Sequence, residues 1–180
     1  PFQGTVMANY AYNVAKARTA VIVQEVSNDY SVGLAKFFVD SFKKLTGNDA
    51  AILATVNYST GDQDFASQLT TIKSLKPDVI FAPGNYTESA LVMKQARELG
   101  ITATFLGGDT WETPEFLDVG KERVDGATFS TFFATEGATS GVSKTFVDEY
   151  VKRYNKDPAA VTALGFDGYL VALDAIKRAD

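Results

Sequence analysis

The fold of this chain is indicated most clearly by residues 78–106, which read DVIFAPGNYTESALVMKQARELGITATFL. The stretch opens with the apolar run Asp78-Val79-Ile80-Phe81 and closes with a second run, Thr102-Ala103-Thr104-Phe105-Leu106. A helical pattern from about Tyr86 to Leu99 separates the two runs. A strand, a helix and another strand in this order are typical of a βαβ unit.

The same alternation continues on both sides of this unit. Five apolar, β-branched runs recur at intervals of roughly 25 to 30 residues, which is the spacing of βαβ units. They occupy residues 20–23, 51–54, 78–81, 102–106 and 127–133. Most of them are continuously apolar, as are strands that are covered on both faces of a parallel sheet. The sequence therefore predicts an α/β, doubly wound fold with a mostly parallel five-stranded sheet and helices on both faces.

Helix start and stop signals lie between these runs. Ser31 is placed to cap one helix, which stops at Gly47, since glycine is favoured just past a helix C-terminus. Asn85 and Glu88 have the spacing of a capping box before the next helix. Thr113-Pro114 begins a short helix, because proline is favoured at the first helical position. Two further helical patterns cover residues 4–16 and 65–75.

The pattern changes after about Thr135. Two helical segments follow, residues 141–155 and 158–178, and no further strand is predicted. We therefore expect residues 1–135 to form one α/β lobe and residues 136–180 to form a separate helical segment. The apolar faces of this segment need cover, and three alternatives stay open: packing on its own sheet, self-association with another chain, or loose order.

The composition excludes several classes of function. The chain has 180 residues, no cysteine, no histidine and a formal net charge of -5. It therefore lacks the residues for a triad with histidine, a thiol nucleophile or a cysteine–histidine zinc site, and neither glycine-rich phosphate-binding motif occurs. We predict no cofactor and no metal. The acidic balance and the lack of a basic run argue against nucleic acid, because phosphate contacts need clustered cations.

Candidate functional residues follow the predicted strands, because open α/β sheets bind ligands just beyond the carboxyl ends of their strands. Tyr30, Tyr86, Asp109 and Trp111 lie in the segments after the first, third and fourth strands. Aromatic walls with a carboxylate suit an amphipathic cationic ligand. Each residue also has a structural alternative: a tyrosine can cover a helix start, Asp109 can cap a helix, and Trp111 can fill the core.

Several short motifs share an order and spacing that resemble those of a known family. They are Phe2-Gln3-Gly4, Ser27-Asn28-Asp29-Tyr30-Ser31, Gly61-Asp62-Gln63-Asp64-Phe65, Lys76-Pro77-Asp78-Val79-Ile80, Phe105-Leu106-Gly107-Gly108-Asp109 and Gly165-Phe166-Asp167-Gly168. Together they resemble the branched-chain amino-acid type of periplasmic solute-binding proteins of ABC transporters. The resemblance covers essentially the whole chain and begins where this family's chain enters its second lobe.

The resemblance implies both a fold and a function. Members of the family are periplasmic or extracellular proteins whose two α/β lobes close on a ligand. They do not catalyse a reaction, and they deliver the ligand to a membrane permease. On this basis Tyr30 and Tyr86 line the ligand site, and Asp109 receives the α-ammonium group of an amino acid. The family often has glutamate at that position, so the identity of the amino acid stays open.

The resemblance also gives the two parts of the chain different places in a two-lobed protein. Residues 1–135 correspond to the second lobe, and residues 136–180 correspond to elements of the first.

Two other functions are alternatives to this one. The same lobe architecture serves as the ligand-sensing domain of some receptors and transcriptional regulators, and this alternative stays open. An enzyme that uses Asp62, Asp64 or Asp109 has no positive support in the sequence. Asp62 and Asp64 precede a helix, where acidic residues more often stabilise the N-terminus than act in catalysis.

Overall fold

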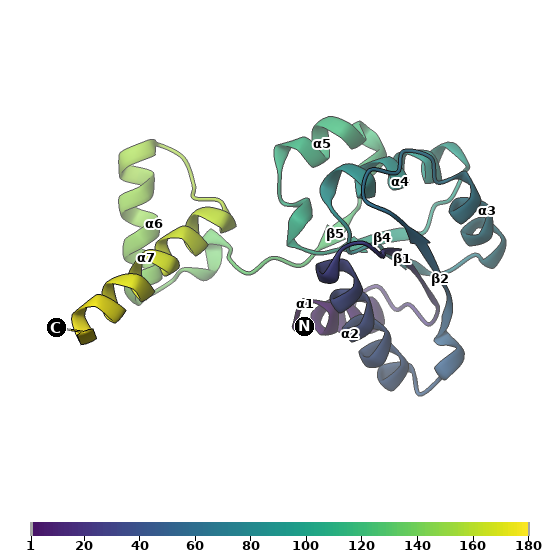
Figure 1. Ribbon diagram of the computed structural model, residues 1–180, viewed down its shortest axis with the longest axis horizontal. Coiled ribbons are helices and arrows are strands. Elements are labelled where there is room, and N and C mark those ends of the chain that lie inside the picture. The colour runs from purple at the N-terminus through teal and green to yellow at the C-terminus, as the bar shows by residue number, and fades with distance from the viewer. Residues whose placement is uncertain (1, 180) are drawn as a thin grey trace. The chain divides into compact units, whose positions relative to one another are not determined.

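The computed structural model describes residues 2–179 (Figure 1). They fall into two compact units, of which the first ends at Ser130 and the second begins at Thr131. The sequence predicted a slightly later boundary, between residues 135 and 136. A helix with the length and apolar character of a membrane span is absent from residues 2–179.

The first unit is built on a parallel sheet of five strands in the order β2-β1-β3-β4-β5. The strands are β1 (Ala20–Glu25), β2 (Ile52–Tyr58), β3 (Val79–Phe81), β4 (Thr104–Gly107) and β5 (Thr128–Phe129). Each of them overlaps one of the five predicted runs, so the predicted α/β fold is confirmed. The strand order turns back between β1 and β3, because β2 lies on one side of β1 and β3 lies on the other.

Helices cover both faces of this sheet (Figure 1). They are α1 (Phe2–Asn13), α2 (Asp29–Thr46), α3 (Ala66–Leu75), α4 (Tyr86–Glu98) and α5 (Pro114–Gly120), with short 3-10 helices η1 (Asp49–Ala51), η2 (Asp109–Trp111) and η3 (Lys121–Val124). On one face Ile22 of β1 joins Phe38 of α2 in a buried cluster, and on the other Val21 and Val23 join residues of α3 and α4. Alternate residues of β1 thus enter two different cores, which explains its unbroken apolar run.

The start of α2 differs from the prediction. The helix begins after Asn28, whose Oδ1 accepts a hydrogen bond from the Tyr30 N–H (3.0 Å), so the predicted cap at Ser31 is wrong. Ser31 lies in the first turn, and its Oγ accepts a hydrogen bond from the Glu25 N–H (3.0 Å). Asparagine and serine cap helices about equally well, so propensity alone does not distinguish the two positions.

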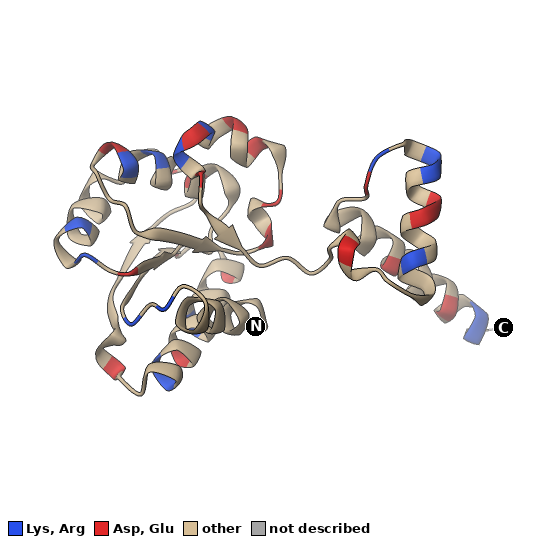
Figure 2. Cartoon of the chain, turned by 180° about the vertical axis from the view of Figure 1, so that it is seen from behind, with Lys and Arg blue, Asp and Glu red and all other residues tan. Residues whose placement is uncertain are grey.

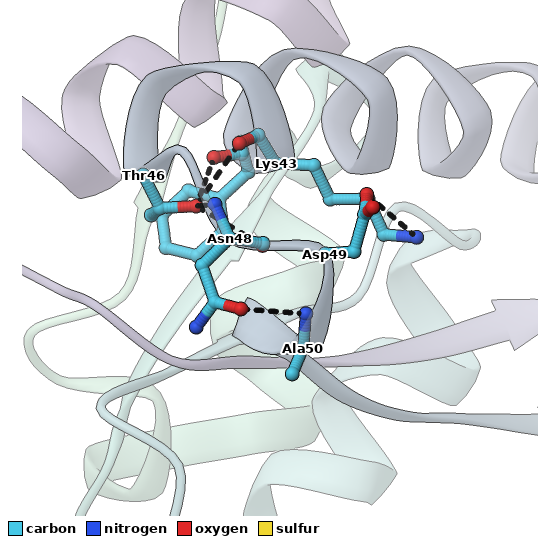
Figure 3. A network of polar contacts seen from close by, with 6 residues as sticks. Lys43, Thr46, Asn48, Asp49 and Ala50 are labelled. Atoms are coloured by element: carbon cyan, nitrogen blue, oxygen red, sulfur yellow. Dashed lines mark hydrogen bonds and ion pairs between the residues drawn. The ribbon is translucent and has the colours of Figure 1, made fainter.

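The end of α2 is where the sequence predicts it. Gly47 terminates the helix with a φ of +64°, in the left-handed region that favours glycine. The next turn is closed by Asn48, whose Oδ1 accepts a hydrogen bond from the Ala50 N–H (2.9 Å) (Figure 3). The Lys43 ammonium also lies 3.9 Å from the Asp49 carboxylate. These contacts bring the chain from α2 into β2.

The capping box predicted at the start of α4 does not form. Asn85 is the N-cap residue, but its side chain accepts no hydrogen bond from the helix. Glu88 is buried and instead accepts a hydrogen bond from the Gly61 N–H (2.8 Å), in the segment after β2. In α5 the prediction is confirmed, since Thr113 Oγ1 accepts a hydrogen bond from the Glu115 N–H (3.2 Å).

The second unit contains η4 (Thr135–Gly137), α6 (Gly141–Tyr154) and α7 (Ala160–Ala179). Phe146 and Phe166 join the two long helices by stacking, with ring centroids 4.7 Å apart. Among the described residues of this unit, only three are buried: Pro158, Ala160 and Ala163. Large apolar side chains of α7 are exposed, including Val161, Tyr169, Val171 and Ile176. The two helices therefore do not bury their apolar faces by packing on each other.

Candidate functional site

The candidate site lies at the carboxyl edge of the sheet, where β1, β3 and β4 end. The strand order turns back between β1 and β3, and doubly wound sheets bind ligands at such a switch point. Tyr30 follows β1, Tyr86 follows β3, and Asp109 follows β4. Three of the predicted site residues therefore stand at the ends of three neighbouring strands.

Tyr30 and Asp109 contact each other directly. The Tyr30 hydroxyl donates a hydrogen bond to Asp109 Oδ1 (2.8 Å), which joins the first turn of α2 to the segment after β4. Burial raises the pKa of Tyr30 above its usual range, and the hydrogen bond and negative charge of Asp109 raise it further. The phenol therefore stays protonated at neutral pH, and it holds the carboxylate in one orientation.

Gln3 holds the backbone of Asp109. Its Oε1 accepts hydrogen bonds from the Asp109 N–H (3.3 Å) and from the hydroxyl of Ser130 (2.9 Å), the buried residue at which the first unit ends. Gln3 thus connects the start of α1, the segment after β4 and the end of the unit. In the sequence, Gln3 stands out only as part of a motif, because its partner Asp109 is 106 residues away.

Tyr86 stands near this pair in the strand order without being bonded to it. It is the first residue of α4, its side chain is 36% exposed, and it forms no side-chain hydrogen bond within residues 2–179. The segments after β3 and β4 are nevertheless tied together, because Thr110 Oγ1 donates a hydrogen bond to the Gly84 carbonyl (2.7 Å). Tyr86 therefore offers an open aromatic surface on a fixed backbone.

Trp111 lies in the core of the first unit. Its side chain is only 1% exposed, and it stacks on Phe116 with ring centroids 5.0 Å apart. The ring occupies the space where a Cβ atom at Gly107 would stand. The structure thus gives Trp111 the packing role that the sequence left open, and its position does not support the predicted ligand contact.

The segments beyond the strands form an acidic edge, which can be followed in Figure 2. Every charged residue in the segments 25–31, 57–65, 83–88 and 107–115 is acidic. Two of these acids serve local structure: Asp62 Oδ2 accepts a hydrogen bond from the Ser59 N–H (2.8 Å), and Asp64 Oδ1 from the Ala66 N–H (2.9 Å). The edge as a whole suits a ligand with a cationic group.

The chain matches the family model described as periplasmic binding protein over residues 2–180. It belongs to the periplasmic binding protein family. Leu/Ile/Val-binding protein BraC3 of Rhizobium johnstonii is 33% identical to it over 148 residues, which cover 81% of this chain and 38% of that protein. The resemblance to the branched-chain amino-acid type is therefore confirmed.

Solved structures agree with this assignment. The leucine binding protein LivK of Thermotoga maritima superimposes with a TM-score of 0.90 at 44% identity, and the match covers 99% of this chain and 50% of LivK. LivJ of Streptococcus pneumoniae, solved in complex with isoleucine, gives a TM-score of 0.78 at 32% identity over 92% of this chain and 46% of LivJ. The chain therefore spans half or less of the length of these relatives. They are named as binding proteins, not as enzymes.

Proposed function

We propose that this chain forms a ligand-binding lobe of a periplasmic or extracellular solute-binding protein, which encloses its ligand between two lobes and delivers it to the permease of an ABC transporter. The proposed ligand is a branched-chain or related amino acid. The observation that carries the proposal is the Tyr30–Asp109 pair, an oriented carboxylate at the switch point of the sheet. The relatives BraC3, a Leu/Ile/Val-binding protein, and LivJ, solved in complex with isoleucine, support this class of ligand.

Asp109 is proposed to receive the α-ammonium group of the amino acid. Its Oδ1 accepts the hydrogen bond from Tyr30, whereas its Oδ2 forms no hydrogen bond within residues 2–179. An ammonium group has three donors and no acceptor, so it is matched to this second oxygen. Asp109 is only partly exposed, which strengthens a charged hydrogen bond compared with one in open water.

The two tyrosines are proposed to form walls of the site. Tyr30 is protonated and therefore adds no second negative charge beside the carboxylate. Tyr86 presents an exposed ring, which suits an aliphatic side chain of the ligand. Trp111 takes no part in this proposal, because its ring is buried against Phe116.

The ligand's α-carboxylate is proposed to be held outside the first unit. The segments beyond the strands contain no lysine or arginine, and their acidic charge repels a carboxylate. In the two-lobed arrangement that the family resemblance implies, the other lobe supplies that partner. Residues 136–180 are proposed to pack on the other lobe, which would cover the exposed apolar faces of α6 and α7.

Isothermal titration of the full-length protein with L-leucine, L-isoleucine, L-valine and the other amino acids tests this function. We expect binding of at least one amino acid, and a loss of affinity of about thirtyfold or more in Asp109→Asn, because a buried charge pair contributes on the order of 2–5 kcal/mol. Asp64→Asn is the matched control, since it makes the same chemical change at the same edge of the sheet and should leave affinity within about twofold. Failure to bind any amino acid, or equal affinity in Asp109→Asn and the wild type, would refute the assignment.

A further inference from the structure

Glu25 is a buried acid that the proposed ligand contacts do not use. It is the last residue of β1, its exposed fraction is 0%, and it forms no ion pair within residues 2–179. Removing a carboxylate from water is costly unless hydrogen bonds replace the lost hydration. The donors that face Glu25 therefore indicate why an acid occupies the end of a largely apolar strand.

Those donors come from the residues that precede the two site tyrosines. Asn28 Nδ2 donates a hydrogen bond to Glu25 Oε2 (3.2 Å), and Asn28 is the N-cap of α2, two residues before Tyr30. Asn85 donates twice, from its backbone N–H to Oε2 (3.1 Å) and from Nδ2 to Oε1 (3.3 Å), and it is the N-cap of α4, directly before Tyr86. One carboxylate therefore holds the starts of both helices.

The side chain of Asn85 shows that this contact takes precedence over capping. An asparagine N-cap usually accepts a hydrogen bond from the first turn of its helix, as Asn28 does from the Tyr30 N–H. Asn85 forms no such bond, and its amide is turned toward Glu25 instead. Gly84 allows this close approach, because a Cβ atom there would clash with the Tyr58 hydroxyl and lie 3.3 Å from Glu25 Oε2.

A third segment is attached to the same group. Thr60, in the segment after β2, donates its hydroxyl hydrogen bond to Glu25 Oε1, and its backbone N–H donates to Ser27 Oγ (2.9 Å). The segments after β1, β2 and β3 thus meet at a single acceptor. A carboxylate suits this position because it accepts several hydrogen bonds at once and donates none when ionised.

We propose that Glu25 is a positioning residue of the ligand site: its buried carboxylate fixes the starts of α2 and α4 relative to each other and so holds Tyr30 and Tyr86 in their binding arrangement. Pre-organised side chains lose less conformational entropy when a ligand binds. This tie, the set of hydrogen bonds from the starts of α2 and α4 to Glu25, therefore raises affinity although Glu25 does not touch the ligand. The role in binding rests on the function proposed above, whereas the tie between the helix starts does not.

Hydrogen–deuterium exchange of the full-length protein without ligand tests the tie. Glu25→Gln keeps the size of the side chain, but it replaces one acceptor oxygen by an NH₂ group. The new N–H donors then face groups that are themselves hydrogen-bond donors. We expect amides in residues 28–32 and 85–89 to exchange about tenfold faster, while those of α3 keep the wild-type rate. Glu88→Gln is the matched control: Glu88 is also a buried acid at this edge, but among the described residues it accepts a hydrogen bond only from the Gly61 N–H, so residues 28–32 should exchange at the wild-type rate.

A double-mutant cycle with L-leucine tests the effect on binding. We expect Glu25→Gln to weaken binding about tenfold in the wild-type background and by less than about threefold in a Tyr86→Ala background, because one of the positioned rings is then absent. If Glu25 contributed only to overall stability, Glu25→Gln would reduce the affinity for L-leucine by the same factor in both backgrounds. If Glu25→Gln does not fold, Asn85→Ala replaces it in both experiments, since it removes a donor and leaves the buried acid in place.

The outcomes separate the two proposals. Wild-type exchange rates at the starts of α2 and α4 in a folded Glu25→Gln protein would overturn the tie between the helix starts. An equal loss of L-leucine affinity on Glu25→Gln in the wild-type and Tyr86→Ala backgrounds would overturn the positioning role. Accelerated exchange at both helix starts in a protein that binds no amino acid would support the tie and overturn the proposed function.

Discussion

Gly108 is the residue on which the geometry of the Tyr30–Asp109 pair depends most directly. It lies between β4 and Asp109, and the Tyr30 hydroxyl occupies the space that a Cβ atom would fill. Leu34 and Gln3 bound the same space, at 3.0 and 3.2 Å from that Cβ position, so the tyrosine has little room to move aside. A side chain at this position would therefore separate the phenol from the carboxylate that it orients.

Replacing Gly108 by alanine tests this packing. We expect Gly108→Ala to weaken amino-acid binding about tenfold or more, because it costs the site one charge-assisted hydrogen bond of roughly 1.5–3 kcal/mol. Gly33→Ala in α2 is the control: nothing lies within 4 Å of its Cβ position, and alanine in a helix should raise stability by about 0.5–1 kcal/mol. Titration calorimetry and thermal unfolding measure both effects. If Gly108→Ala bound amino acids as tightly as the wild type, the Tyr30–Asp109 pair would not depend on the absence of a side chain at residue 108.

Single residues of the site were predictable to different degrees. Tyr30 and Asp109 could be chosen because each follows a predicted strand, where open α/β sheets bind ligands, and the structure joins them by a hydrogen bond. Trp111 belongs to the same segment as Asp109, yet its ring turns into the core, and sequence position does not fix a side chain's direction. Gln3 bonds to Asp109, and Glu25 bonds to Thr60 and Asn85 as well as to nearby Asn28. No local pattern records the distant partners.

At the scale of elements, the amino ends of β1 and β3 are joined by Asp78. Its Oδ2 accepts hydrogen bonds from the backbone N–H groups of Arg18 (2.8 Å) and Thr19 (2.9 Å) and from the Thr19 hydroxyl (2.9 Å). The Asp78 N–H in turn donates to Thr19 Oγ1 (3.1 Å). This network fixes the register in which β1 meets β3, at the edge of the sheet opposite the candidate site.

The Asp78 network predicts a pH dependence of stability. Desolvation raises the pKa of Asp78, but the hydrogen bonds from Arg18 and Thr19 outweigh it and lower the pKa below 3.8. Stabilisation by this group is therefore complete above the unfolded-state value and is lost as the pH falls through the lower, folded-state value.

Urea unfolding of Asp78→Asn measures this contribution. We expect a loss of about 1 kcal/mol at pH 7, because the group is partly exposed to solvent, and a smaller difference from the wild type below about pH 4. Asp40→Asn, on the exposed side of α2, is the control and should unfold like the wild type. A difference between Asp78→Asn and the wild type that stays constant down to pH 2 would contradict the linkage.

Elements were predicted well where burial alone decides them. The run 20–23 is apolar at every position because β1 is covered on both faces, and that pattern gave the strand correctly. Helix starts were harder, because Asn28 and Ser31 are both good caps, and because Glu88 bonds to Gly61 instead of closing a capping box. Propensity is a local property, whereas these choices depend on contacts between segments.

At the scale of the whole molecule, the first unit presents only part of the chemistry that an amino acid needs. Its carboxyl edge offers a carboxylate and two tyrosines, but no cationic side chain for an α-carboxylate. The second unit leaves large apolar side chains exposed, including those of Val161 and Val171. Both features agree with a chain that spans about half of the LivK structure.

The incomplete site predicts weak binding by residues 1–180 on their own. A dissociation constant of 1 µM requires about 8 kcal/mol of binding free energy, and an open edge with one charged contact, two tyrosine walls and free access of water falls short of this. Titration calorimetry of L-leucine into this chain should therefore give a dissociation constant well above 1 µM, and the full-length two-lobed protein should bind much more tightly. Asp109→Asn in the isolated chain should abolish the remaining signal, because no other group of the edge is assigned to the ammonium. Micromolar or tighter binding by residues 1–180 would mean that the first unit holds the whole ligand, including its carboxylate, and would overturn the division of the site between two lobes.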